Sequence, residues 1–164
     1  MMRNLLLSKK IGVFLIVLLS LLVGNVNGAT FYSVVSGNWN SAATWSATPG
    51  GAPGTSVPGA AAYVIINTSN KVTVDVNEAA RSITINGTLE VDKNDAISLI
   101  VEGDITVNLD GKFECLSGGT PTIIIKGNFT NNGTTDFNQA NVIVVGNFIS
   151  PETSILQNLG NLII

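Results

Sequence analysis

The stretch Ile123-Ile-Ile-Lys-Gly-Asn-Phe129 returns later in the chain as Val142-Ile-Val-Val-Gly-Asn-Phe148. An earlier copy is Leu99-Ile-Val-Glu-Gly-Asp-Ile105, and the pattern starts once more at Leu162. Each copy has three or four apolar residues, a variable position, Gly, Asn or Asp, and a large apolar residue. Recurrence at an interval that drifts around a value of about 20 residues is typical of the stacked coils of a parallel β-helix.

The chain beyond residue 60 consists of short runs of alternating β-branched residues, separated by Asn, Gly, Asp and Ser. Alternation with a period of two predicts strands, and the clearest runs are Lys71–Val76, Ser82–Ile85, Asp104–Val107 and Thr122–Ile125. No segment after residue 30 has a convincing apolar stripe at helical spacing. The nearest helical candidate, Asn77–Arg81, is so short that we predict a turn there.

We therefore predict an all-β fold, a parallel β-helix (solenoid) of about five coils. Each strand would pair with its counterpart in the next coil, about 4.8 Å away. A β-sandwich is the alternative, because strand–turn–strand repeats occur in both folds. In the solenoid three glycines would stack at a corner, each followed by a residue that tolerates left-handed geometry. These pairs are Gly103-Asp104, Gly127-Asn128 and Gly146-Asn147.

Strand parity predicts which side chains face the shared core. The single cysteine, Cys115, has the parity of Phe113, so we expect a buried thiol that behaves as a small hydrophobe and forms no internal disulfide. The predicted core is Val64, Ile66, Val72, Val74, Ile83, Ile85, Leu89, Val91, Leu99, Val101, Ile105, Val107, Phe113, Ile123, Ile125, Phe129, Phe137, Val142, Val144, Phe148 and Leu162.

Residues 1–29 have the order of a secretory signal peptide: a basic start, an apolar run from Ile11 to Val23, and then small and polar residues. This apolar run is clearly shorter than the stretch of about 20 residues that a membrane-spanning helix needs. We expect cleavage after Gly28 or Ala29, with no membrane insertion afterwards, and a secreted or cell-surface protein.

The charge of the processed chain excludes two classes of partner. Five basic and eleven acidic residues remain after residue 29, a net charge of −6. Such a chain cannot neutralise a row of phosphates, which argues against nucleic acid, and it is equally unsuited to anionic lipid. The sequence has no histidine, the acidic residues are scattered, and the densest acidic group, Asp92–Asp95, has the chemistry of a turn. We predict no catalytic site, no metal site and no cofactor.

Residues 30–62 form a separate segment before the repeats of residues 63–164. This segment contains Trp39 and Trp45, followed by a Pro/Gly-rich stretch from Pro49 to Gly59. The two tryptophans have two interpretations: a cap that covers the core of the first coil, or a glycan-contact platform on which sugar rings stack. Since the sequence stops within a repeat, we expect the solenoid to be truncated at its C-terminus.

The same segment carries a resemblance to a known family. The runs that carry it are GNWNSAATW (37–45), Gly50-Gly51, SVPGAAAYVII (56–66), KVTVDV (71–76) and SITINGTLEV (82–91). Together they resemble the opening of the domain family named for eight glycines, which is common in large surface proteins of Bacteroidota exported by type IX secretion. The resemblance covers about residues 36–91. It implies a tryptophan pair, a Val-Pro-Gly turn and a right-handed β-helix, in extracellular proteins linked to adhesion or polysaccharide handling.

Two functions follow from these observations. The first is an adhesin or structural binding module of a cell surface, which would contact extracellular polysaccharide or a host or cell-surface glycan. The alternative is a carbohydrate-binding or polysaccharide-degrading, lyase-like module, which rests on Trp39, Trp45 and fold analogy.

Overall fold

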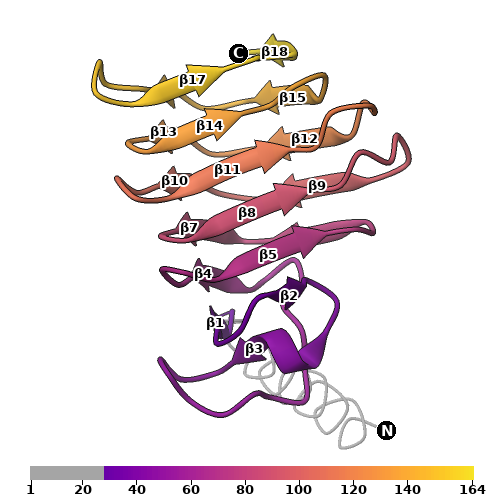
Figure 1. Cartoon of the computed structure of the whole chain (residues 1–164), viewed down its shortest axis with the longest axis vertical. Helices are drawn as coiled ribbons and strands as arrows, with labels where there is room; N and C mark the ends of the chain where they lie inside the picture. The colour runs from indigo at the N-terminus through magenta and orange to yellow at the C-terminus, as the bar shows by residue number, and fades with distance from the viewer. Residues whose placement is uncertain (1–27) are drawn as a thin grey trace, which may run out of the picture.

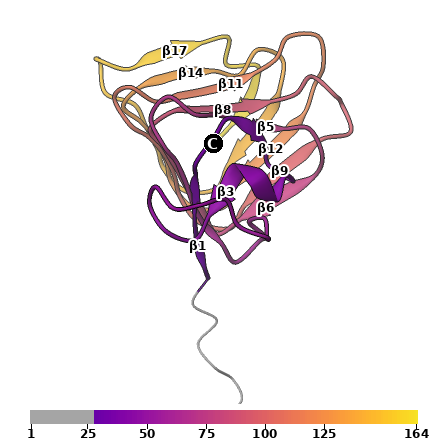
Figure 2. The same ribbon diagram turned by 60° about the horizontal axis from the view of Figure 1, so that its bottom comes forward.

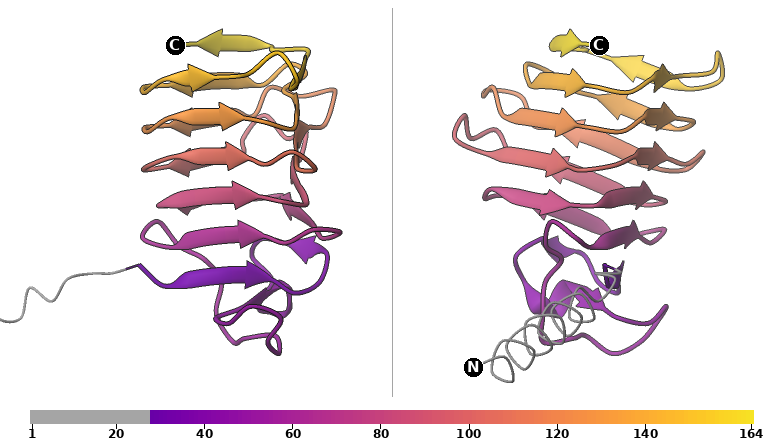
Figure 3. Two further views of the ribbon diagram at one scale, coloured as in Figure 1. Left: turned by 90° about the vertical axis from the view of Figure 1, so that its left-hand side faces the viewer. Right: turned by 180° about the vertical axis from the view of Figure 1, so that it is seen from behind.

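The protein is a solenoid of three parallel β-sheets that share one core (Figures 1 and 3). The computed structural model describes residues 28–164, so almost all of the predicted signal peptide lies outside the described residues. We call the seven-, six- and five-stranded sheets A, B and C. Among the described residues, no helix is long and apolar enough to cross a membrane. The one helical element in this part of the chain is a single 3-10 turn, η1 (Ala42–Thr44).

The strands follow one another in the order A, B, C around each coil. Sheet A contains β1 (Thr30–Ser33), β3 (Trp45–Ser46), β4 (Tyr63–Ile66), β7 (Ser82–Ile85), β10 (Ile105–Val107), β13 (Phe129–Asn131) and β16 (Phe148–Ile149). Sheet B contains β2 (Gly37–Asn38), β5 (Lys71–Val74), β8 (Thr88–Val91), β11 (Lys112–Cys115), β14 (Thr134–Asp136) and β17 (Ile155–Gln157). Sheet C contains β6 (Glu78–Ala80), β9 (Ser98–Val101), β12 (Thr122–Ile125), β15 (Asn141–Val144) and β18 (Asn161–Ile163).

The predicted solenoid of about five coils is confirmed. The strands from β4 to β18 make five three-strand coils, and β1 with β2 forms a partial coil before them. Every strand pair except β1–β3 is parallel, which excludes the sandwich alternative. In Figure 1 the front strands of sheet B run toward the upper right as the chain rises, which is the sense of a right-handed coil.

The strand register reproduces the alignment of the sequence repeats. Ile123 on β12 lies opposite Leu99 on one side and Val142 on the other, and Val142 lies opposite Leu162. The uneven spacing of these positions along the sequence therefore gives the lengths of successive coils. A one-residue slip would turn the whole apolar set toward solvent, so the buried face keeps this register.

The predicted core is buried, with two exceptions in the last coil. Phe148 and Leu162 pack against the core but are only partly buried, because no further coil of the described chain covers them. The core also contains residues that strand parity did not assign: Trp39, Trp45, Ala62, Ala80, Ile97 and Ala140. Phe113, Phe129, Phe137 and Phe148 form one aromatic cluster, with ring centroids 5.2 to 6.2 Å apart.

Cys115 is buried, as the parity of its strand predicts. Burial, together with the nearby carboxylates of Asp136 and Glu114, raises the pKa of the Cys115 thiol from 9.0 to about 12. The thiol is therefore protonated at neutral pH and acts as apolar filling rather than as a nucleophile.

The corner between sheets C and A has the predicted stack of glycines. The Gly127 N–H donates to the Gly103 carbonyl at 3.0 Å, and the Gly146 N–H donates to the Gly127 carbonyl at 3.0 Å. A Cβ on Gly127 would lie 2.5 Å from the Gly103 carbonyl carbon, so glycine is required by close approach of the backbones. None of Asp104, Asn128 and Asn147 has a positive φ, so this corner does not use the left-handed geometry that these residues tolerate.

These three polar residues instead form a ladder from coil to coil. Asp104 Oδ1 accepts the Asn128 N–H at 2.7 Å, and Asn128 Oδ1 accepts the Asn147 N–H at 3.0 Å. The left-handed residues other than glycine are Ser69, Asn138 and Asn158, which lie at the other two corners. At this corner, hydrogen bonds between polar side chains and the backbone of the next coil therefore take the place of left-handed turns.

A second glycine row, which the sequence analysis did not predict, lies at the corner between sheets A and B. The Gly87 carbonyl accepts the Lys112 N–H at 2.8 Å, and the Gly111 carbonyl accepts the Thr134 N–H at 3.0 Å. At both glycines an added Cβ would lie 2.4 Å or less from a backbone oxygen. Gly133 is the third member of this row. The available signal was the tripeptide Asn-Gly-Thr, present at 86–88 and again at 132–134.

The predicted turn at Asn77–Arg81 is wrong, since Glu78–Ala80 is strand β6. Its register places Glu78 opposite the core residue Leu99. Burial, and then the charge of Asp75, raise the pKa of the Glu78 carboxyl from 4.5 to about 7. Asp75 Oδ1 is itself buried without a hydrogen-bond partner among residues 28–164. Packing against β9 therefore overrides the local sequence of β6 and brings two carboxyl groups together.

The glycine corner is testable by adding one methyl group. We expect Gly127→Ala to lower the free energy of unfolding by about 1–3 kcal/mol, because the backbone of the neighbouring coil would have to move. Gly59→Ala is the matched control, since a Cβ there meets nothing within 4 Å. Urea unfolding followed by circular dichroism measures both, and equal stability of the two variants would contradict the close-approach argument.

The Glu78 carboxyl makes stability depend on pH. Its pKa is higher in the folded state, about 7 against 4.5, so folding is favoured most when this group is protonated and is progressively disfavoured as the pH rises through that window. We expect Glu78→Gln to lose less stability than the unmodified protein between about pH 5 and about pH 8. Glu152→Gln, at an exposed position, should follow the unmodified protein. Parallel pH dependence of all three proteins would contradict the raised pKa.

Candidate functional site

Trp39 and Trp45 lie together at the N-terminal end of the stack, where the sequence allowed either a cap or a glycan-contact platform. Both are 0% exposed, and their rings meet edge to face with centroids 5.3 Å apart. The Trp45 indole N–H donates to the Trp39 carbonyl at 2.7 Å, and the Trp39 indole N–H donates to the Pro58 carbonyl at 3.4 Å. Neither indole therefore presents a ring face to solvent on which a sugar could stack.

The tryptophan segment covers the first partial coil. β3 pairs antiparallel with β1, with Trp45 opposite Ser33, so it blocks the outer edge of sheet A. The backbone N–H of Trp39 donates to the Thr73 carbonyl at 2.8 Å, which connects the tryptophan segment to β5. Figure 2 shows η1 and β3 lying across the end of the stack. The edge strand at this end is then only the two residues of β3, and such a short edge strand disfavours pairing with another chain.

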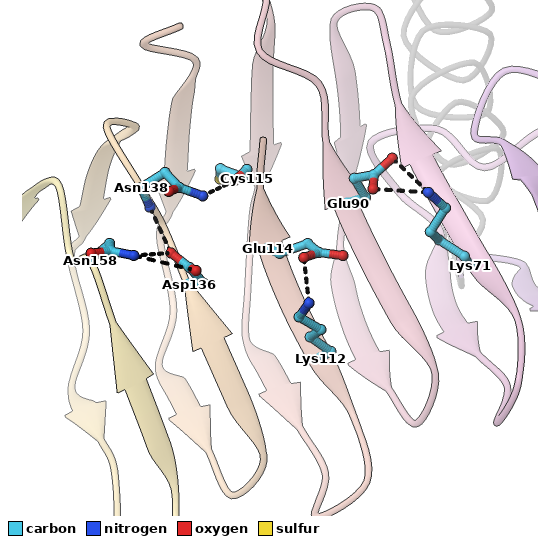
Figure 4. Close-up of polar contacts among 8 residues, drawn as sticks. All are labelled: Lys71, Glu90, Lys112, Glu114, Cys115, Asp136, Asn138 and Asn158. Atoms are coloured by element: carbon cyan, nitrogen blue, oxygen red, sulfur yellow. Dashed lines mark hydrogen bonds and ion pairs between the residues drawn. The ribbon is translucent and has the colours of Figure 1, made fainter. Parts of the chain in front are cut away.

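The outer face of sheet B carries most of the ion pairs of the described chain (Figure 4). Lys71 Nζ lies 2.9 Å from Glu90 Oε2, and the Thr73 hydroxyl donates to Glu90 Oε1 at 3.1 Å. One coil further on, Lys112 Nζ lies 2.5 Å from Glu114 Oε2. The carboxylates on this face are thus held by neighbours on the same sheet and offer little to a ligand.

Asp136 continues this face without a lysine. Its Oδ1 accepts the backbone N–H of Asn138 at 3.1 Å and the side-chain amide of Asn158 at 3.2 Å (Figure 4). The Asn138 amide in turn donates to the Cys115 carbonyl. These contacts close the turns between sheets B and C in successive coils, so Asp136 has a structural role.

The predicted turn at Asp92–Asp95 is closed by its own side chains. Asp92 Oδ1 accepts the Lys93 N–H at 2.6 Å, and Asp95 Oδ1 accepts the N–H of Thr120, in the next coil, at 2.5 Å. Across residues 28–164 no group of three or more acidic or cysteine side chains is arranged to hold a metal ion.

A polar surface hollow lies at the corner between sheets C and A and extends over three successive coils. Its volume is about 320 Å³, and it is lined by Tyr63, Arg81, Ser82, Glu102, Gly103 and Asp104. The strand register explains why these residues lie together. Tyr63 lies opposite Ser82 in the next coil, and the Gly103 N–H donates to the Arg81 carbonyl at 2.7 Å. Residues that are far apart in the sequence are thereby brought to one place.

The hollow contains a cation and an aromatic ring in contact. The Arg81 guanidinium lies over the Tyr63 ring, 5.6 Å from its centroid, and the Tyr63 residue is 38% exposed. The Glu102 carboxylate is already engaged, since both of its oxygens accept from Lys126 Nζ at 2.8 Å. An exposed ring beside charged and hydroxyl groups is an arrangement suited to binding a polar, ring-shaped ligand.

Part of this hollow follows from the strand register that the sequence repeats predict. Residues that precede the corner, Arg81, Glu102 and Lys126, form one in-register row. Within this row, Lys126 and Glu102 form an ion pair between neighbouring coils. The position of Tyr63 beside Arg81 was not predicted, because it depends on the way β4 and β7 pair.

The family match includes part of the cap as well as the coils. The G8 domain family model matches residues 44–152, about two thirds of the chain. This match begins in η1 and extends beyond β16, so it includes the later repeats as well as part of the tryptophan segment that carried the resemblance. No curated protein and no solved structure gives a significant match. The chain belongs to the G8 domain family.

Proposed function

We propose that the protein is a secreted module of a bacterial cell surface that acts as an adhesin or structural element and binds extracellular polysaccharide or a host-cell glycan. The order of residues 1–29 supports export. Membership of the G8 domain family and the solenoid fold suit an extracellular binding module. The resemblance to type IX-secreted proteins of Bacteroidota supports placement on the outer surface.

The filled interior directs binding to the outside of the solenoid. The inward side chains are mostly apolar and are packed together, so no ligand can enter between the sheets. Parallel strands are paired from coil to coil along all three sheets, which makes the surface rigid. A rigid surface loses little conformational entropy when it binds, which favours recognition of an extended polymer.

The hollow between Tyr63 and Asp104 is the single observation that carries the proposal. It brings together, on a concave surface, an aromatic ring, hydroxyl groups and a guanidinium that forms no ion pair among residues 28–164. We assign glycan contact to this hollow rather than to Trp39 and Trp45, because both indoles are fully buried. The tryptophans then serve as the cap.

A polysaccharide-degrading, lyase-like activity is the second candidate. It is favoured by the presence of Arg81, Glu102 and Asp104 in one hollow, since such enzymes use a basic side chain near carboxylates. We propose binding rather than catalysis because Glu102 is neutralised by Lys126 and one Asp104 oxygen is held by Asn128. Incubation with the bound polymer separates the two, because only an enzyme shortens the chains.

Export is the first part of the proposal to test. We expect the full-length chain, expressed in a Gram-negative host, to leave the cytoplasm and to be cleaved after Gly28 or Ala29. N-terminal sequencing of the exported protein should begin at Ala29 or Thr30. Replacing Leu18 and Leu19 in the apolar run by arginine is the control that should keep the protein unprocessed. Retention of the intact N-terminus in the cytoplasm would contradict a secreted module.

Binding is the second part. We expect the exported protein to bind at least one member of a panel of immobilised bacterial and host polysaccharides, with a Kd on the order of 0.1 mM per site. Ser82→Tyr would fill the hollow and should weaken binding about tenfold or more. Thr134→Tyr is the matched control, because Thr134 is also the first, outward-facing residue of its strand.

The outcomes of this experiment are separable. Failure to bind any polysaccharide would refute the proposed function. Equal binding by the Ser82→Tyr and Thr134→Tyr variants would place the contact elsewhere on the solenoid. Circular dichroism of both variants checks that neither substitution disturbs the fold.

A further inference from the structure

The cations of the described chain divide into two kinds. Lys71, Lys112 and Lys126 each form an ion pair with a glutamate on the solenoid surface. Arg81 and Lys93 form no ion pair among residues 28–164. Of these two, Arg81 lines the hollow, whereas Lys93 lies in the turn between sheets B and C.

Among residues 28–164, Arg81 is held in place through its backbone, without the use of its guanidinium donors. Its backbone N–H donates to the Ala62 carbonyl at 2.8 Å, and its carbonyl accepts the Gly103 N–H at 2.7 Å. The guanidinium packs on the Tyr63 ring, which positions it but satisfies none of its N–H groups. A guanidinium has five donors in a planar fork that matches the two oxygens of a carboxylate.

The neighbours of Arg81 limit the charge that a ligand can carry. Glu102 lies in the same row as Arg81 and Lys126, one coil from each, yet both of its oxygens bond Lys126. Asp104 uses Oδ1 to accept the Asn128 N–H. The hollow therefore combines one unshared positive charge with the Asp104 carboxylate. A ligand that suits this pair presents an anionic group to Arg81 and a hydrogen-bond donor to Asp104, and Asp104 repels a doubly charged phosphate more strongly than a singly charged carboxylate.

We propose, on the basis of the glycan-binding function above, that the hollow recognises a sugar that bears a carboxylate. Arg81 pairs with the carboxylate of the sugar through two parallel N–H···O bonds. Asp104 accepts a hydrogen bond from a ring hydroxyl, and the Ser82 and Tyr63 hydroxyls complete the polar contacts. The protein thereby distinguishes acidic from neutral polysaccharides, with Arg81 as the residue that determines specificity.

The experiment compares each acidic oligosaccharide with its own methyl ester, which lacks the carboxylate charge. Oligogalacturonate and oligomannuronate serve as probes, and a sulfated dextran reports whether any anion is sufficient. We expect the free acids to bind the exported protein about tenfold more tightly than the esters, as for a charge-assisted pair. Raising the salt concentration should reduce this preference.

Arg81→Gln should abolish the preference for acid over ester, whereas Lys93→Gln, which removes the same charge at the other corner, should leave it intact. Equal binding of acids and esters by the unmodified protein would overturn the inference, as would an equal loss in the two variants or tighter binding of sulfated dextran. Each of these results would leave the proposed glycan binding in place. Absence of binding to every polysaccharide would instead refute the proposed function itself.

Discussion

The structure depends on the in-register pairing of each strand with its equivalent in the next coil. Neighbouring strands lie about 4.8 Å apart, and at the corner between sheets C and A the backbones of Gly103, Gly127 and Gly146 are hydrogen-bonded directly to one another at 3.0 Å. That distance leaves no room for a Cβ. These glycines therefore allow the backbones of successive coils to approach each other at this corner and keep the strands in register.

In-register stacking also determines the pattern of charges on the outer surface. Equivalent outward-facing residues of successive coils form a column. The charge of one residue is therefore either neutralised or left unpaired, depending on the residue one coil away. The row that precedes the glycines runs Arg81, Glu102, Lys126 and Val145. Glu102 lies between two cations and bonds Lys126, which leaves the Arg81 guanidinium to pack on Tyr63. The candidate binding hollow is thus a consequence of charge order along one column.

The two ends of the described solenoid differ in how their sheets are covered. At the N-terminal end, β3 and the buried pair Trp39 and Trp45 close the edge of sheet A. The same end contains the carboxyl groups of Asp75 and Glu78, whose charges repel each other, and Glu78 lies in register with a core residue. In the last coil, the inward-facing Leu156 is 37% exposed and Leu162 is only partly buried. The N-terminal cap is therefore made by a segment of different composition, and not by a modified coil.

The sequence by itself determined the solenoid, its coil lengths and nearly all of its core, because alternation and spacing directly encode which side faces inward and which residues stack. It also determined the glycine row at 103, 127 and 146. Only the tertiary structure decided that Glu78–Ala80 is a strand, since its pairing with β9 overrides a local sequence that has no strand pattern. Likewise, the burial of Trp39 and Trp45 and the meeting of Tyr63, Arg81 and Asp104 arise from contacts between coils. Such contacts depend on how coils of unequal length stack, and that information is absent from any single segment of the chain.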